Sequence, residues 1–280
     1  LLPLGPDGAL SAAAMRTLLG PLPPAPVGIR TFTVPIPTDH CPTWVIPALP
    51  MMTMAMLALS HAETPGIKEG AALRWLAFSD QPRTVQSHYK DGRIVLKADG
   101  EAFFVAQADN NPSIPDLPPL LDATTVNLDG LSLYQEGKLF HGPTFQVLEK
   151  IVQTGKNGVT TLLKPCAPDI LLDGATHGVP HDNLKQWFPE LPDKMAAYPL
   201  RLLSLALLGA PPQQSVRCEL RAIGISESGL PRIEAWLFEE NRLLAYLCWE
   251  EALLPKGRIG NASPLERRAF LSGQFVPGVS

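Results

Sequence analysis

Two ionisable residues in this 280-residue chain each border an apolar segment. His40 precedes the apolar run 45–52, and Asp173 follows the apolar residues 170–172. Histidine titrates closer to neutrality than any other unperturbed side chain, so His40 is the candidate general base. An apolar setting raises the pKa of a carboxyl group, so Asp173 is the candidate general acid. We expect each residue to stand at the start of a buried helix.

Asp173 and His177 are four positions apart, so on a helix they share one face. A solvated helix face would show the same spacing, but the apolar residues before Asp173 favour a buried pair. Upstream, the adjacent Gly142 and Pro143 are typical of a loop whose backbone comes close to a substrate. Backbone N–H groups in such a loop could bind a carbonyl oxygen as negative charge develops on it.

These residues belong to two motifs. The first is Asp39-His40 with the apolar segment that follows it, and the second is Leu171-Leu172-Asp173-Gly174-Ala175-Thr176-His177, preceded by Tyr134-x-x-Gly137-x-x-Phe140-His141-Gly142-Pro143-Thr144-Phe145-Gln146. On these motifs the chain resembles the dehydratase domains of polyketide synthases and of the related polyunsaturated fatty acid synthases, over roughly positions 28 to 258. The second motif matches better than the first.

The resemblance implies a double hotdog enzyme that removes water from a β-hydroxyacyl thioester. His40 would be the base and Asp173 the acid, facing each other across a tunnel between the two halves. His177 occupies the position of a Gln or His that binds the substrate hydroxyl or the Asp. Tyr134 occupies the position of a tyrosine whose hydroxyl assists the acid, although aromatic residues such as Tyr134 and Phe145 more often have a core role than a catalytic one. No metal or organic cofactor is implied, because the substrate is carried on the phosphopantetheine of an acyl carrier protein.

The segment after His40 departs from the pattern of modular synthases, which have Gly four and Pro nine residues after the histidine. Here the fourth residue is Trp44, and prolines follow at Pro47 and Pro50. A shortened loop that contains Trp44 and Pro47 could still present the base, or the site could have lost its activity. Pro180 also interrupts the helix after Asp173 early.

Other chemistries find less support. His61, His88 and His141 lie apart from one another and from a carboxylate triplet, so no zinc site is expected. The chain contains no G-x-S-x-G, Walker or G-x-G-x-x-G motif. Its four widely spaced cysteines are Cys41, Cys166, Cys218 and Cys248. We expect reduced thiols, and a nucleophilic Cys41 is disfavoured because neighbours on a strand point to opposite faces.

Composition describes a globular protein, with 45% hydrophobic and 18% charged residues. The net charge of −4 gives no electrostatic reason to expect nucleic acid or an anionic membrane as a partner. The longest apolar stretch, 45–59, contains Pro47 and Pro50 and is shorter than the about 20 residues of a membrane span. Without a recognisable signal peptide, the expected location is the cytoplasm.

The order of elements is the same in both halves: strand, apolar helix, then antiparallel strands. In the first half we expect a strand at 28–35, a helix at about 49–62, and strands at 73–78, 83–89, 93–97 and 102–107, with turns at Asp91-Gly92 and Asp99-Gly100. In the second we expect strands at 131–134, 145–152 and 160–164, a helix at Asp173, and strands at 215–222, 232–239 and 242–251, with a turn at Glu240-Asn241. This order predicts an α+β fold in which two antiparallel sheets each wrap a central apolar helix.

The predicted domain plan is a linker at 1–27, a first hotdog half at 28–111, an inter-half linker at 112–128, a second half at 129–258 and an exit linker at 259–280. Expected partners are an acyl carrier protein, other domains of a megasynthase and, as an open alternative, a second copy of the chain. Three other functions stay open: a non-catalytic module that docks acyl carrier protein, an enoyl isomerase with the same His–Asp pair, and a thioesterase.

Overall fold

A computed structural model describes residues 28–40, 47–115, 118–136, 138–139, 141–181, 183–193 and 195–255. The expected linkers 1–27 and 259–280 lie outside these ranges, as do Cys41 and Trp44. Within them, no helix is long and apolar enough to cross a membrane.

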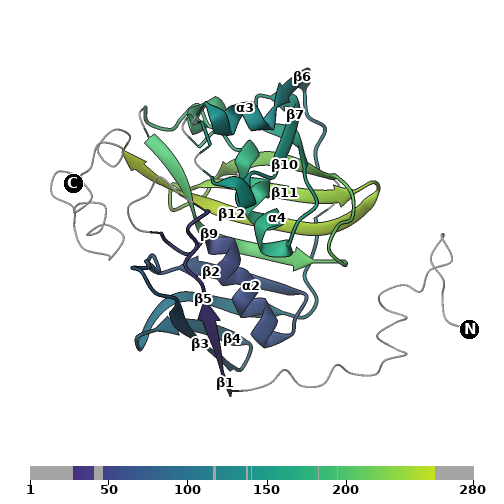
Figure 1. The fold of residues 1–280 in the computed structure, drawn as a ribbon. Coiled ribbons are helices and arrows are strands. Elements are labelled where there is room, and N and C mark those ends of the chain that lie inside the picture. The colour runs from purple at the N-terminus through teal and green to yellow at the C-terminus, as the bar shows by residue number, and fades with distance from the viewer. Residues whose placement is uncertain are drawn as a thin grey trace, which may run out of the picture.

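One antiparallel sheet of twelve strands dominates the structure (Figure 1). Its strands are β1 Gly28–Val34, β2 Gly66–Ala72, β3 Arg83–Lys90, β4 Arg93–Ala98, β5 Glu101–Asp109, β6 Ala123–Asp129, β7 Leu148–Gly155, β8 Gly158–Leu163, β9 Met195–Leu207, β10 Val216–Ile225, β11 Pro231–Glu239 and β12 Arg242–Pro255. Their order across the sheet is β1-β3-β4-β5-β2-β9-β12-β11-β10-β8-β7-β6. Strands from the two halves of the chain therefore occupy separate sides and meet where β2 pairs with β9.

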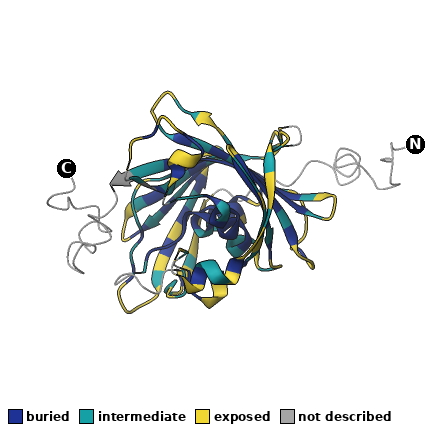
Figure 2. Ribbon diagram, turned by 90° about the horizontal axis from the view of Figure 1, so that it is seen from above, coloured by how far each residue is buried: buried dark blue, intermediate teal, exposed yellow. Residues whose placement is uncertain are grey.

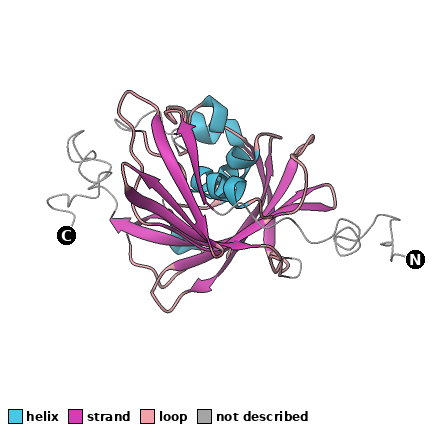
Figure 3. Cartoon of the chain, turned by 90° about the horizontal axis from the view of Figure 1, so that it is seen from below, coloured by secondary structure: helices cyan, strands magenta, loops and turns pink. Residues whose placement is uncertain are grey.

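The helices gather on the inner side of this curved sheet (Figure 3). They are α2 Met51–Ala62, α3 Gly130–Gln135 and α4 Pro168–Gly174, with single 3₁₀ turns η1 Pro143–Phe145, η2 Ala175–Gly178 and η3 Leu184–Gln186. Figure 2 shows the strands curving around a central helix whose residues are mostly buried. Helices α2 and α4 contact each other. The core therefore runs without a break from one half to the other, and its central residues belong to one cluster.

Helix α2 is apolar on nearly every side because it lies against β2, β3, β4 and β5 and also against α4. Met52 is 2% exposed and Ala55 is fully buried, whereas Ser60 is the one exposed residue of the helix. A helix enclosed in this way has no polar face to mark its periodicity. The predicted helix at 49–62 is confirmed to within two residues.

Three strands were missing from the prediction, and β9 is the most important of them. Its sequence is rich in Ala and Leu, which favour helix, and it contains Pro199. Hydrogen bonding to β2 on one side and β12 on the other overrides that preference. Pro199 is accommodated opposite Glu251, next to a register shift in the β12 pairing. The other two strands are β2, in which Ile67 is the one residue of high β propensity, and β6, in which such residues are confined to Thr124, Thr125 and Val126.

Two predicted strands are wrong. Residues 131–134 lie in helix α3, whose N-cap residue Asp129 accepts a hydrogen bond from the backbone N–H of Ser132 at 3.1 Å. That cap outweighs the alternating pattern that suggested a strand. Residues 73–78 form no strand and contribute a single bridge, between Ala77 and Ala48.

The connection between the halves passes over the outer face of the sheet. The carbonyl of Pro119 accepts a hydrogen bond from Arg221 Nε at 2.9 Å, and Arg221 is only 4% exposed. Earlier in the connection, Ile114 packs on a small outer cluster that includes Trp236 and Tyr246. The connection thus covers both polar and apolar side chains of the outer face.

Candidate functional site

Helix α4 delivers Asp173 to the interior of the molecule. The helix begins with Pro168 at its first position, which suits proline because no intrahelical hydrogen bond is needed there. Asp173 therefore stands in the last turn of α4, and the expectation that it opens a helix was wrong. The chain continues as η2, in which Thr176 Oγ1 donates to the Asp173 carbonyl at 2.8 Å. The side chain of Asp173 is 10% exposed.

His177 keeps the predicted proximity to Asp173 although the backbone changes from α to 3₁₀ between them. Its Nε2 lies 3.4 Å from Asp173 Oδ2, and its side chain is 1% exposed. Gly174 permits the close approach of this segment to the preceding loop, because a Cβ there would lie 2.3 Å from Val147 Cγ2. The solvated-face alternative for this pair is therefore excluded.

His40 comes from a turn at residues 38–40, ten or more residues before α2 begins, so it does not open a helix either. Its Nε2 lies 3.4 Å from Asp173 Oδ1. The two residues therefore meet at the junction of the two halves despite their separation in sequence. Side-chain exposures of 17% for His40 and 10% for Asp173 show that the contact is largely enclosed.

Asp39 holds the His40 turn against the second half. The backbone N–H of Gly142 donates to the Asp39 carbonyl at 2.8 Å, and the N–H of Thr144 donates to the Asp39 carboxylate. A Cβ at Gly142 would lie 2.1 Å from Asp39 Oδ1 and 2.7 Å from the Asp39 carbonyl oxygen. Glycine is therefore needed here for the contact between the halves. Its N–H is already used, so the expectation that this group binds substrate was wrong.

His141 is a site residue that the sequence analysis missed. Its Nε2 lies 3.6 Å from Asp173 Oδ2, and its side chain is 6% exposed. Its ring meets the His40 ring edge to face at 5.2 Å and lies 3.9 Å from the His177 ring centroid. His141 was set aside with His61 and His88 as a histidine outside any group of possible metal ligands, and for His141 that expectation was wrong, because it lies beside His40 and Asp173. The available signal was its place immediately before Gly142 in the second motif.

We call the compact group of these four side chains the His–Asp cluster; its members are His40, His141, Asp173 and His177. His61 and His88 lie elsewhere, as expected: His61 Nδ1 is hydrogen-bonded to Ser87 Oγ at 2.9 Å inside the first half.

Tyr134 fixes the orientation and the tautomer of His177. The Tyr134 hydroxyl lies 2.8 Å from His177 Nδ1 and accepts a hydrogen bond from the N–H of Leu148 at 3.1 Å. Burial raises the pKa of Tyr134, so its hydroxyl stays protonated and its own proton points at Nδ1. His177 then carries its proton on Nε2, which faces Asp173.

The imidazoles control the charge of Asp173. Burial by itself raises the pKa of this carboxyl group, but the adjacent charge of His40 and the hydrogen bonds from His177 and His40 outweigh burial. The pKa of Asp173 is therefore held below its usual range, opposite to the expectation from its apolar neighbours. Burial, reinforced by the charge on His177, lowers the pKa of His141 to about 2. His141 is therefore neutral at physiological pH.

The remaining predicted site residues surround the cluster or lie outside the described ranges. Pro143 begins η1, which places the Phe145 ring edge to face on His40 at 5.1 Å. Pro47 accepts a hydrogen bond from the N–H of Phe78 at 2.8 Å and so anchors the chain before α2. Trp44 and Gly137 fall on positions that are not described.

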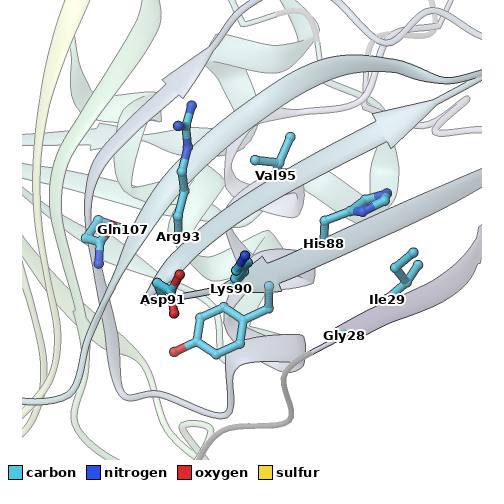
Figure 4. A pocket seen from close by; sticks show the side chains of 9 residues that line it. Gly28, Ile29, His88, Lys90, Asp91, Arg93, Val95 and Gln107 are labelled. Carbon is cyan, nitrogen blue, oxygen red and sulfur yellow. The ribbon is translucent and has the colours of Figure 1, made fainter.

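A groove on the outer face of the first half is separate from the cluster (Figure 4). It is lined by Gly28, Ile29, His88, Tyr89, Lys90, Asp91, Arg93, Val95 and Gln107. Val95 lies between Ile94 and Leu96, which are fully buried, so it faces away from α2. No residue of the His–Asp cluster lines this groove.

Comparison with solved structures shows which fold this is. GphF Dehydratase 1 is 15% identical, with a TM-score of 0.62 over 86% of this chain and 99% of that one; a variant of it is described as isomerase-inactive. The dehydratase domain of a mycocerosic acid synthase-like polyketide synthase is 15% identical, with a TM-score of 0.61 over 80% and 90%. An inactive His-to-Phe mutant of the CurJ dehydratase, solved with a bound compound, is 14% identical, with a TM-score of 0.57 over 80% and 90%.

The chain therefore has the hotdog-type fold of polyketide synthase dehydratase domains. No protein-family model matches its sequence, and no curated protein matches it.

Proposed function

We propose that this chain is a dehydratase that converts a β-hydroxyacyl thioester, carried by an acyl carrier protein, into an α,β-enoyl thioester. The observation that carries the proposal is the 3.4 Å approach of His40 Nε2 to Asp173 Oδ1 at the junction of the two halves. The fold supports it, because the structures it matches include dehydratases. We interpret β1–β5 with α2, and β6–β12 with α4, as the two halves of a double hotdog.

The reaction needs one base and one acid. His40 Nε2 takes the proton from the carbon next to the thioester carbonyl, and the electron pair of that C–H bond forms the double bond. The C–O bond to the hydroxyl breaks as Asp173 Oδ1 delivers its proton to the departing oxygen, which leaves as water. The pair ends as imidazolium and carboxylate, so the total number of protons is conserved.

The resting cluster holds Asp173 ionised, as it is at the end of the reaction. Before the next turnover one proton must pass from His40 to Asp173, and their polar atoms already face each other at 3.4 Å. An acyl chain that displaces water would favour this transfer, because a low-dielectric site disfavours separated charges. Substrate binding thus prepares the neutral base and the protonated acid together.

His177 and Tyr134 orient the acid rather than react. The N–H of Leu148 donates to the Tyr134 hydroxyl, which holds His177 against Asp173 Oδ2. The other carboxylate oxygen, Oδ1, is left directed at His40. His141, neutral and buried, forms a wall of the site and has no proton to exchange in this scheme.

The decisive experiment is water elimination from a 3-hydroxyacyl thioester on an acyl carrier protein, followed by the absorbance of the conjugated product. His40→Ala and Asp173→Asn should each lower the rate by about 10²–10⁴-fold. The matched controls His88→Ala and Asp169→Asn change a histidine outside the cluster and a carboxylate in the first turn of α4, and should retain activity. Wild-type turnover that survives His40→Ala would refute the assigned base.

The enoyl isomerase is the second candidate, because a variant of the similar GphF dehydratase 1 is described as isomerase-inactive. The same pair could remove a proton at one carbon and return it at another. Incubation with an α,β-enoyl thioester distinguishes the two: isomerisation moves the double bond without releasing or consuming water. A non-catalytic module that docks acyl carrier protein would show neither reaction. We also propose that the chain works with other domains of a megasynthase in the cytoplasm. Pairing with a second copy of the chain stays an open alternative.

A further inference from the structure

We propose that the His–Asp cluster also binds a divalent cation of the zinc class, through His40, His141 and Asp173, and that the bound cation blocks dehydration. The site follows from the arrangement of these three side chains. Only the blocking effect rests on the proposed function.

The starting observation is that His141 has no step in the proposed reaction. Dehydration is complete with one base and one acid, yet a third imidazole is buried with its Nε2 3.6 Å from Asp173 Oδ2. His141 therefore places a second imidazole nitrogen beside the carboxylate that His40 also approaches, and these three side chains can together hold a metal ion.

The spacing of the donor atoms suits a small cation. One ligand atom from each of His40, His141 and Asp173 lies within 4.8 Å of the other two. His40 Nε2 lies 3.4 Å from Asp173 Oδ1, and His141 Nε2 lies 3.6 Å from the other carboxylate oxygen, Oδ2. Zinc bonds of about 2.0–2.2 Å in a tetrahedron place neighbouring ligand atoms roughly 3.3–3.6 Å apart. Small side-chain rotations therefore bring all three donors to bonding distance.

The donor set identifies the class of metal. Two imidazole nitrogens and one carboxylate oxygen suit zinc and neighbouring transition metals rather than Mg²⁺ or Ca²⁺, which prefer all-oxygen sites. Catalytic zinc sites commonly use three protein ligands and leave a further position open. Here the open position would be where the proposed substrate binds.

The surroundings already hold the carboxylate as a ligand is usually held. His177 Nε2 lies 3.4 Å from Asp173 Oδ2, and Tyr134 fixes His177 through a 2.8 Å hydrogen bond. Such outer contacts orient metal ligands and raise affinity. A carboxylate has about four lone-pair positions on its two oxygens, so Asp173 can accept from His177 and still bind a cation.

Metal and substrate would then compete for the same atoms. The lone pair on His40 Nε2 that takes the substrate proton is the pair that would bind the cation, and Asp173 cannot deliver a proton while it is a metal ligand. The cation would therefore act as a competitive inhibitor.

The test measures metal binding directly on chelator-treated protein. Zn²⁺ is titrated in competition with a chromogenic chelator, and Co²⁺ binding is followed by the visible absorption of four- or five-coordinate cobalt. We expect one equivalent in the wild type. Affinity should fall about 10–100-fold in His177→Ala, the usual cost of an outer contact, and further in His141→Ala, His141→Gln and Asp173→Asn. The controls His88→Ala and Asp169→Asn should bind as the wild type does.

Equal affinity in the wild type and in both His141 variants, or the absence of one-equivalent binding, would overturn the metal site. Thermal unfolding verifies that each variant is folded. In the activity arm, chelator-treated protein should be active and Zn²⁺ should raise the apparent KM; loss of activity on chelation would overturn the blocking effect. A protein with the expected binding pattern but no turnover would refute the dehydratase proposal and leave the metal site standing.

Discussion

Each half of the molecule buries a histidine near the end of its helical segment, and the two histidines differ in one neighbour. His61 in α2 and His177 in η2 are 3% exposed, and each binds a hydroxyl through Nδ1: Ser87 Oγ at 2.9 Å and Tyr134 at 2.8 Å. Burial is the main cause that lowers the pKa of both. Four residues before His177 stands Asp173, whereas Leu57 occupies that position before His61.

The difference shows that this fold buries an imidazole both with and without a neighbouring carboxylate. In the first half the histidine is buried beside Ser87, and the proposed base, His40, comes from a separate turn. In the second half the buried histidine lies next to a carboxylate, Asp173, which is the proposed acid. A buried histidine is therefore not by itself evidence of chemistry; the carboxylate four residues earlier supplies it.

The largest effect should come from separating the base of one half from the acid of the other. Gly142→Ala places a Cβ 2.1 Å from Asp39 Oδ1 and 2.7 Å from the Asp39 carbonyl oxygen, so the His40 turn must move while the Asp173–His177 pair stays intact. Misplacement by about 1 Å can cost about 10²-fold in rate, and we expect a loss of this size. Steady-state dehydration kinetics measure it.

Asp39→Asn is the matched control, because it preserves the backbone contact and one side-chain oxygen. It should lose much less activity than Gly142→Ala. Equal activity of Gly142→Ala and the wild type would show that the contact between the halves does not position the base.

The sequence supported those parts of the site that lie within one local element. Asp173 and His177 were paired through helical spacing, and α2 was recognised by its apolar composition. The role of Gly142 could not be predicted, since it depends on Asp39, which lies far away in sequence. His141 was missed for the same reason: only the folded chain brings it to Asp173. Strand β9 was missed because pairing on both sides overrides its local preference.

Replacing each histidine tests the comparison between the halves directly. His177→Ala removes the orienting contact on Asp173 and should lower dehydration about tenfold, less than loss of the base or acid itself. His61→Ala should leave activity unchanged and lower the free energy of unfolding by about 1–3 kcal/mol, because Ser87 loses its buried partner. Kinetics and denaturant unfolding of both variants decide between the roles. A comparable loss of activity in His61→Ala would contradict the assignment.

The pH dependence of stability isolates the imidazole that has no counterpart in the first half. His141 has a pKa of about 2 in the folded protein and an ordinary value near 6.5 when unfolded. As the pH falls below 6.5 the unfolded state takes up a proton that the folded state does not, so stability decreases. Between pH 7 and pH 5 this amounts to about 2 kcal/mol.

His141→Phe should remove that part of the acid sensitivity, as measured by urea unfolding at the two pH values. The lowered pKa of Asp173 also makes the protein less stable as the pH falls. That effect acts below the usual titration range of a carboxyl group, so it does not contribute between pH 7 and pH 5. His61 lies outside the His–Asp cluster and contributes equally to wild type and variant. An unchanged difference between pH 7 and pH 5 would show that His141 titrates normally.

The smallest effect concerns α3, the helix that carries Tyr134 and has no equivalent beside His61. Its N-cap is the Asp129 side chain, which accepts from the N–H of Ser132 at 3.1 Å. Asp129→Ala should cost about 1 kcal/mol of stability, and Asp129→Asn much less, because asparagine caps about as well as aspartate. A less stable α3 weakens the contact of Tyr134 with His177. Asp129→Ala should therefore also lower the dehydration rate, by less than His177→Ala does. If Asp129→Ala loses stability but none of its activity, α3 supports the fold alone, and the orientation of His177 depends on Leu148 and the packing around Tyr134.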